Sequence, residues 1–216
     1  MRFKTIFFDL DDTLYPKSSG LWSAIRNRMN DYMAELLDLP PDEIVTLRQH
    51  YLETYGTTLR GLQIHHHIDT DQYLDYVHNF PLAEFIQPDP RLGQMLATLP
   101  QQKYIFTNAD INHAQRVLSI LNLGMSFTRI IDIRALDFVC KPDPMAYTRA
   151  LEIAGVSTAE ECILFDDAPR NLQPAREQGW YTVLVGEEVP DPCAYLSLSN
   201  LHALPQVMPQ LWNHSS

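Results

Sequence analysis

Short apolar runs alternate with amphipathic segments along the second half of the chain. Residues 4–8 are apolar nearly throughout, as expected for a strand buried on both faces of a sheet. Similar runs follow, and the predicted strands are residues 4–8, 103–106, 129–133, 162–165 and 181–185. Three predicted helices lie between these strands. They are residues 112–123, a helix that runs from the Asp143-Pro144 cap to Gly155, and residues 171–178. This alternation predicts an α/β fold with parallel strands joined by helical crossovers.

Residues 16–87 break this rhythm and have a helical pattern. Apolar residues recur at helical spacing in 21–37 and 42–55, and 71–80 is a third candidate helix. An insertion of this length predicts a small helical bundle. Because it leaves from the acidic loop after the first strand, we expect a lid over the strand ends, the alternative being a bundle docked elsewhere. The expected domains are a core made of 1–15 and 88–216 and an all-helical cap made of 16–87.

Composition narrows the class of protein. The 216 residues are 45% hydrophobic, which is ample for a packed core, and no run approaches the roughly 18 apolar residues of a membrane span. The first residues are typical of a strand rather than a signal peptide. A net charge of −11 opposes binding to nucleic acid polymers or anionic membranes, but not to small anions. Cys140, Cys162 and Cys193 match neither a disulfide framework nor a zinc pattern, which favours a cytoplasmic location.

Polar residues follow three of the predicted strands. Asp9 and Asp11 follow the first, Thr107 and Asn108 the second, and the pair Asp166-Asp167 ends a later one. Ligands of parallel sheets gather at the carboxyl ends of the strands, so these three loops should converge. Several carboxylates in one place repel one another unless a cation neutralises them. We expect Mg²⁺, which prefers hard oxygen ligands.

The Asp-X-Asp spacing of the first loop suits a two-step reaction. Residues i and i+2 of an extended chain point the same way. Asp9 could bind metal and attack phosphorus, giving an aspartyl-phosphate. Asp11 could protonate the leaving alcohol and then deprotonate the attacking water. Such a reaction also needs hydrogen-bond donors for the phosphoryl oxygens, and Thr107 and Asn108 suit that role. It also needs a fixed cation, and Lys141 suits that role.

Taken together, these motifs resemble the haloacid dehalogenase-like (HAD) superfamily of phosphohydrolases. The matching stretches, which extend over residues 1 to about 186, are DLDDT at 9–13, FTNA at 106–109, CKPDP at 140–144 and FDDAPRN at 165–171. The resemblance implies a Rossmann-like core and Asp9 as the nucleophile. It implies Asp11 as general acid and base, and Thr107 and Lys141 as phosphate contacts.

The same resemblance implies the metal ligands and the type of cap. The ligands would be the Asp9 side chain, the Asp11 backbone carbonyl and an acid of the last motif. Asp167 falls in the direct-ligand position and Asp166 in the preceding one. The helical insertion is similar to a C1-type cap. The stretches DLDDTLYP, YGTTLRGL, TNA with a following His113, and FVCKP resemble the pyrimidine 5′-nucleotidase branch, which implies a nucleoside monophosphate such as UMP or CMP as substrate.

Several residues of the insertion have two interpretations. We expect His65-His66-His67 to form polar surface, with substrate contact or a transition metal as the alternatives. Three consecutive side chains do not easily converge on one ion. Tyr51, Tyr55 and Tyr73 lie at helical spacing and are expected in a core rather than stacked on a base. Arg60 fits a substrate anion or a surface ion pair equally well.

Competing functions differ in the residues that they need. A dehalogenase would need neither metal nor Asp11, whereas a phosphomutase acting on a sugar phosphate would keep Asp11. A phosphoaspartate signalling module uses acids, a threonine and a lysine on a parallel sheet, but it is shorter and lacks an inserted cap. A binding protein on an inactive phosphatase scaffold would lack some catalytic group, and none is missing here. We therefore expect a small phosphorylated substrate. The pattern does not predict an oligomeric state.

Overall fold

A parallel sheet forms the centre of the larger part of the molecule. The computed structural model describes residues 3–212, and within them the sheet has six strands in the order β3-β2-β1-β4-β5-β6. The strands are β1 (Thr5–Phe8), β2 (Gln102–Phe106), β3 (Arg129–Ile131), β4 (Cys162–Asp166), β5 (Tyr181–Val185) and β6 (Leu196–Leu198). Every neighbouring pair is parallel. The predicted α/β fold with a parallel, Rossmann-like sheet is confirmed.

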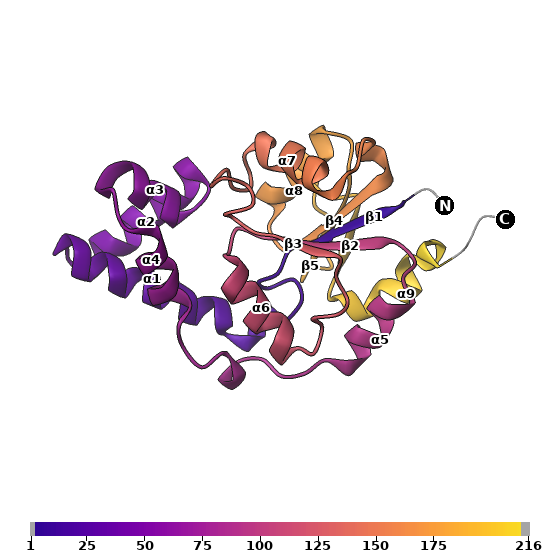
Figure 1. Ribbon diagram of the computed structural model, residues 1–216, viewed down its shortest axis with the longest axis horizontal. Helices are drawn as coiled ribbons and strands as arrows, with labels where there is room; N and C mark the ends of the chain where they lie inside the picture. The colour runs from indigo at the N-terminus through magenta and orange to yellow at the C-terminus, as the bar shows by residue number, and fades with distance from the viewer. Residues whose placement is uncertain (1–2, 213–216) are drawn as a thin grey trace. The chain divides into compact units, whose positions relative to one another are not determined.

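Helices cover both faces of this sheet. Helices α7 (Pro144–Ala154) and α8 (Pro169–Glu177) lie on one face, and α5 (Pro90–Thr98), α6 (Ile111–Ile120) and α9 (Leu204–Val207) lie on the other (Figure 1). Local chemistry sets their ends. Asp143 caps α7 by accepting from the Met145 N–H at 2.9 Å, and Gly155 closes it with φ of 69°.

Two boundaries differ from the sequence prediction. Helix α6 ends at Ile120 rather than at residue 123, because Asn122 adopts the left-handed region with φ of 58° and breaks the helical path. Strand β3 ends at Ile131 rather than at residue 133. The next residue, Asp132, accepts backbone N–H groups of Ile111 and Ala135 at 3.0 Å each, which draws the chain out of the sheet into a loop.

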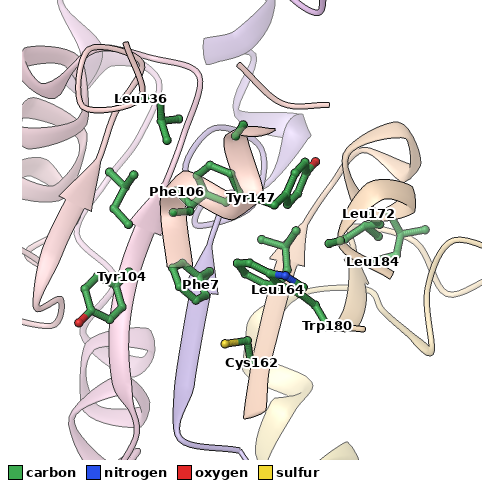
Figure 2. Packing of buried hydrophobic residues seen from close by; sticks show 14 residues of the cluster. Phe7, Tyr104, Phe106, Leu136, Tyr147, Cys162, Leu164, Leu172, Trp180 and Leu184 are labelled. Atoms are coloured by element: carbon green, nitrogen blue, oxygen red, sulfur yellow. The ribbon is translucent and has the colours of Figure 1, made fainter. Parts of the chain in front are cut away.

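Aromatic and aliphatic side chains fill the face between the sheet and α7 and α8. Trp180 is fully buried, with its ring 4.7 Å from that of Phe7 and 6.0 Å from that of Tyr147 between centroids (Figure 2). Burying one large apolar side chain contributes about 1.5–3 kcal/mol. Since Phe7 belongs to β1 and Leu164 of the same cluster belongs to β4, the two central strands are held rigidly. They carry the acidic loops.

Two compact units make up the chain. One contains the residues up to Ser18 together with those from Ile86 onward, and the other is Ser19–Phe85. The smaller unit consists of α1 (Leu21–Leu37), α2 (Pro41–Tyr55), α3 (Thr58–His66) and α4 (Thr70–His78). The sequence prediction did not resolve α3. Its Gly61 packs against the Tyr51 ring so closely that an added Cβ would lie 2.2 Å from it.

Two features bear on the expectations from composition. Among residues 3–212, none of the helices combines the length and the apolar character that a bilayer crossing requires. The side chains of Cys140, Cys162 and Cys193 are all free thiols, and none forms a disulfide.

Candidate functional site

The sheet register brings the three polar loops to one edge. Phe8, the last residue of β1, pairs with Ile105 of β2 and with Phe165 of β4. Asp9 continues this register, because its N–H donates to the Phe165 carbonyl at 2.8 Å. Asp9, Thr107 and Asp166 therefore end neighbouring strands on the same side. The convergence that the sequence predicted is present in the structure.

Lys141 joins two of the acidic loops. Its Nζ donates to Oδ1 of Asp9 at 2.8 Å and to Oδ2 of Asp166 at 2.6 Å. The lysine is fully buried. Burial lowers the pKa of Lys141, but the charges of Asp166 and Asp9 more than offset this and raise it above the ordinary value. Lys141 is thus a fixed cation at the strand ends.

Asp9 is held in an environment that disfavours excess negative charge. Burial raises the pKa of its carboxyl well above the ordinary value, Lys141 opposes this, and the charges of Asp166 and Asp167 raise it further. The carboxylate is 8% exposed. A cation that replaced part of the lost hydration would restore the ionised form of Asp9.

Asp166 is locked by groups from α8. The Asn171 Nδ2 donates to its Oδ1 at 2.9 Å and to its Oδ2 at 3.2 Å, and the Ala168 N–H donates to Oδ1 at 3.0 Å. Asn171 is itself held, because its carbonyl accepts the Tyr147 hydroxyl at 2.5 Å. With Lys141 added, every oxygen of Asp166 has donors. These contacts hold the carboxylate in place, and the carboxylate in turn holds Lys141.

Three carboxylates suit a divalent cation. Asp9, Asp166 and Asp167 each offer an oxygen, and these atoms lie within 4.8 Å of one another. When all three carboxylates are ionised, they and the charge of Lys141 sum to a net charge of about −2, and the hard oxygen donors match Mg²⁺. Burial and the charge of Asp166 raise the pKa of Asp167 to about 7, although Lys17 lies 3.4 Å from its Oδ2 and opposes this. The residues present therefore fit a Mg²⁺ site.

Asn108 has a role that the sequence did not reveal. Its Nδ2 donates to the Lys141 carbonyl, and its Oδ1 accepts the Lys141 N–H, both at 2.8 Å. The Asn108 side chain therefore fixes the backbone that carries the buried lysine. The phosphate contact expected of Asn108 then falls to its backbone N–H. Thr107 is 2% exposed, and its Oγ1 accepts the Ala109 N–H at 3.0 Å.

Asp11 is held by two residues that the motif analysis did not assign. The Tyr15 hydroxyl donates to its Oδ1 at 2.6 Å, and the His113 Nε2 lies 2.9 Å from the same oxygen. The Asp11 side chain is 13% exposed, whereas that of His113 is fully buried. The carboxylate thus keeps access to solvent while its orientation is fixed from behind.

The residues singled out in the insertion all belong to the smaller unit. His65 and His67 are exposed and His66 is half-buried, as the expectation of polar surface had it. Tyr51 and Tyr73 are buried in the core of that unit, and Tyr55 is half-buried. Within residues 3–212, the acidic trio at the strand ends is the one metal-type cluster, so the transition-metal alternative for the histidines has no support.

Arg60 is exposed, and its Nη1 lies 3.5 Å from the Gln63 Oε1. Among the described residues, Arg60 forms no surface ion pair.

Sequence reasoning missed His113, Tyr15 and Asn171 as parts of the site. A signal existed for His113, since it shares the buried face of its helix with Ala114 and Val117 and a buried histidine requires a partner. The spacing alone did not identify which acid it meets, because the two residues are 102 positions apart.

Known proteins resemble this chain in sequence and in fold. "Phosphate metabolism protein 8" of Saccharomyces cerevisiae is 29% identical over 190 residues, which cover 82% of this chain and 59% of that protein. Among solved structures, the HAD-hydrolase YfnB of Bacillus subtilis, bound to magnesium, matches with a TM-score of 0.66 and 16% identity over 97% of this chain and 100% of its own. An L-2-haloacid dehalogenase of Xanthobacter autotrophicus matches with a TM-score of 0.61 and 17% identity over 96% and 98% of the two chains. The structural matches show the shared fold.

The family follows from a match over most of the chain. The model of haloacid dehalogenase-like hydrolases matches residues 3–179, which include all four motifs and the whole acidic site. The chain therefore belongs to the haloacid dehalogenase-like hydrolase family.

Proposed function

We propose that this protein is a Mg²⁺-dependent phosphomonoester hydrolase that works through an aspartyl-phosphate. One observation carries the proposal: Asp9 is buried against a fixed cation, with a second, independently held carboxylate two residues further on. A nucleophile and a general acid on one short loop are what a two-step phosphoryl transfer requires.

In the first step, Asp9 attacks phosphorus and the bond between phosphorus and the ester oxygen breaks. Asp11 donates its proton to the leaving alcohol. In the second step, Asp11 takes a proton from water, which attacks the phosphorus of the aspartyl-phosphate and releases inorganic phosphate with Asp9 restored. Asp11 thus acts as an acid in the first step and as a base in the second.

The surrounding residues support charge and orientation. Lys141, held by Asp166 and by Asn108, would balance charge that develops on the phosphoryl oxygens. Thr107 and the Asn108 N–H would bind those oxygens. Asp9, Asp167, the Asp11 carbonyl and, next to them, Asp166 would hold Mg²⁺. When bound, Mg²⁺ would offset the negative charge that keeps a phosphate ester away from the carboxylates.

Asp11 argues against the dehalogenase activity of one structural relative. Displacing halide from carbon needs no protonation of a leaving alcohol and no metal, so neither Asp11 nor the acidic trio would be required. Here Asp11 is held by two donors and the trio is assembled. A phosphomutase would use the same groups, and its distinguishing product is a rearranged ester rather than free phosphate.

For the substrate, we propose a pyrimidine nucleoside 5′-monophosphate, with a sugar phosphate as the alternative. The proposal rests on the resemblance of DLDDTLYP, YGTTLRGL, TNA with His113, and FVCKP to the pyrimidine 5′-nucleotidase branch. We further propose that the helical unit Ser19–Phe85 acts as a C1-type cap that selects the ester. The chain spans 59% of the length of the curated relative that it matches, and the activity proposed here does not rest on that relative.

Phosphate release from a panel of esters tests the proposal. The panel contains UMP, CMP, AMP, sugar phosphates, phosphoglycolate and pyridoxal phosphate, each with Mg²⁺ and with chelator. We expect Mg²⁺-dependent release with preference for UMP and CMP. Preference for another ester would retain the reaction and contradict the substrate. A long-lived phosphoaspartate without release would favour a signalling role, and no release from any ester would contradict the hydrolase proposal.

A further inference from the structure

Two side chains from different elements meet on one oxygen of Asp11. The Tyr15 hydroxyl lies 2.6 Å from Oδ1 and the His113 Nε2 lies 2.9 Å from the same atom. Tyr15 stands a few residues after β1, and His113 lies in the first turn of α6. The contacts therefore connect the acidic loop to a helix that follows a different strand.

The position of His113 is fixed by its helix. Its backbone N–H donates to Oδ1 of Asp110, the N-cap residue of α6, at 2.8 Å. Its imidazole is fully buried on the helix face that also buries Ala114 and Val117. A buried ring in the first turn of a capped helix has little freedom to move, so its Nε2 presents a rigid contact to Asp11.

Tyr15 is a donor whose direction is also fixed. The side chain is 4% exposed. Its phenolic hydroxyl donates to Oδ1 of Asp11. An ionised carboxylate only accepts, so His113 presents Nε2–H to that form of Asp11.

We propose that His113 and Tyr15 are positioning residues, which donate to Oδ1 of Asp11 and thereby orient the carboxylate that exchanges protons with the leaving alcohol and with water. This inference rests on the proposed hydrolase function. Two donors on one oxygen orient the carboxylate plane and stabilise its charged form after the proton has left. Neither residue touches the substrate in this scheme.

The opposing interpretation is that His113 only packs the helix against the loop. The two interpretations differ in their dependence on the leaving group. An alkoxide is a poor leaving group and needs the proton of Asp11, whereas 4-nitrophenolate leaves readily without it. The value of kcat/KM reports the reaction through the first phosphoryl transfer, so it isolates the step in which Asp11 acts as an acid.

The experiment compares the wild type, His113→Ala and His113→Gln on two esters with Mg²⁺: 4-nitrophenyl phosphate and the best alkyl ester of the panel. We expect His113→Ala to lower kcat/KM for the alkyl ester by roughly 10- to 100-fold, and that for 4-nitrophenyl phosphate by less than about 3-fold. Glutamine places an N–H near the position of Nε2, so His113→Gln should recover most of the loss. Tyr15→Phe should show the same selectivity for the alkyl ester.

Val117→Ala provides the matched control, because it removes buried volume from the same helix face without removing a donor. It should change both esters by the same factor. An equal loss for both esters in His113→Ala, or unchanged rates, would overturn the inference while leaving the hydrolase proposal intact. Absence of phosphate release by the wild type from either ester would overturn both.

Discussion

Replacing Asp167 by asparagine should stabilise the protein in chelator while removing its response to Mg²⁺. Burial, with the charge of Asp166 in addition, raises the pKa of the Asp167 carboxyl from an ordinary 3.8 to about 7. Between these two values the folded chain holds a proton that the unfolded chain has released. Stability from this group is therefore present below pH 4 and is lost as the pH rises through about 7.

The magnitude follows from the size of the pKa difference. Since each tenfold change in proton affinity corresponds to about 1.4 kcal/mol, a rise to about 7 is equivalent to at most about 4 kcal/mol. The Asp167 side chain is 19% exposed and Lys17 lies beside it, so solvent and the lysine screen part of this. We expect Asp167→Asn to gain about 2 kcal/mol at pH 8, or roughly 4–8 °C in Tm for a chain of this length.

Thermal unfolding followed by circular dichroism measures the effect at pH 5 and pH 8, with chelator and with Mg²⁺. The gain in chelator should shrink at pH 5, where the wild-type carboxyl is largely protonated. Mg²⁺ should raise the Tm of the wild type and leave that of Asp167→Asn nearly unchanged. Glu188→Gln, which removes one exposed charge, is the control and should change neither quantity. A destabilised Asp167→Asn in chelator at pH 8 would refute the electrostatic reasoning.

Four further substitutions test single residues. Asp9→Asn should reduce phosphate release below detection while leaving the circular dichroism spectrum unchanged, because it removes the nucleophile; rates like those of the wild type would contradict the mechanism. Asp11→Asn should phosphorylate slowly at best, and rapid multiple turnover measured by phosphate release would remove Asp11 as acid and base. Gly61→Ala should lower the Tm although alanine favours helices, because its Cβ would lie 2.2 Å from the Tyr51 ring. Gly93→Ala in α5, where the nearest atom is a leucine methyl at 3.4 Å, should stabilise by about 0.5–1 kcal/mol, and equal effects of the two glycine substitutions would contradict this packing argument.

The sequence predicted most elements that carry a local signal. The first cap helix was predicted at 21–37, which is where α1 lies, and the Asp143-Pro144 cap and Gly155 stop set the limits of α7. Helix α5 was missed although Asp89 caps it and Pro90 opens it, a pattern of the same kind. Strand β6 has only three residues and no apolar run to reveal it. The signal for α5 was therefore present in the sequence, whereas that for β6 was not.

The sequence predicted which loops form the site, but not which side chains contact one another there. Strand-end placement indicated that Asp9 and Asp166 would meet, since parallel strands end on one edge. The side-chain clamp of Asn108 on Lys141 and the contact of His113 with Asp11 depend on how a loop and a helix pack, which residue spacing does not encode. The role of the Asn108 side chain in holding Lys141 was not predicted, whereas the phosphate contact expected of Asn108 stays a prediction.

The most direct measurement of the central claim is to trap the phosphoenzyme. The protein is mixed with its best ester and Mg²⁺, quenched within the first turnover, and reduced with borohydride, which converts an aspartyl-phosphate to homoserine. Peptide mass spectrometry then locates the modified residue. We predict homoserine at position 9, only with ester and Mg²⁺ present, and none in Asp9→Asn. Turnover of the ester with an unmodified Asp9, or with label on another residue, would contradict the account.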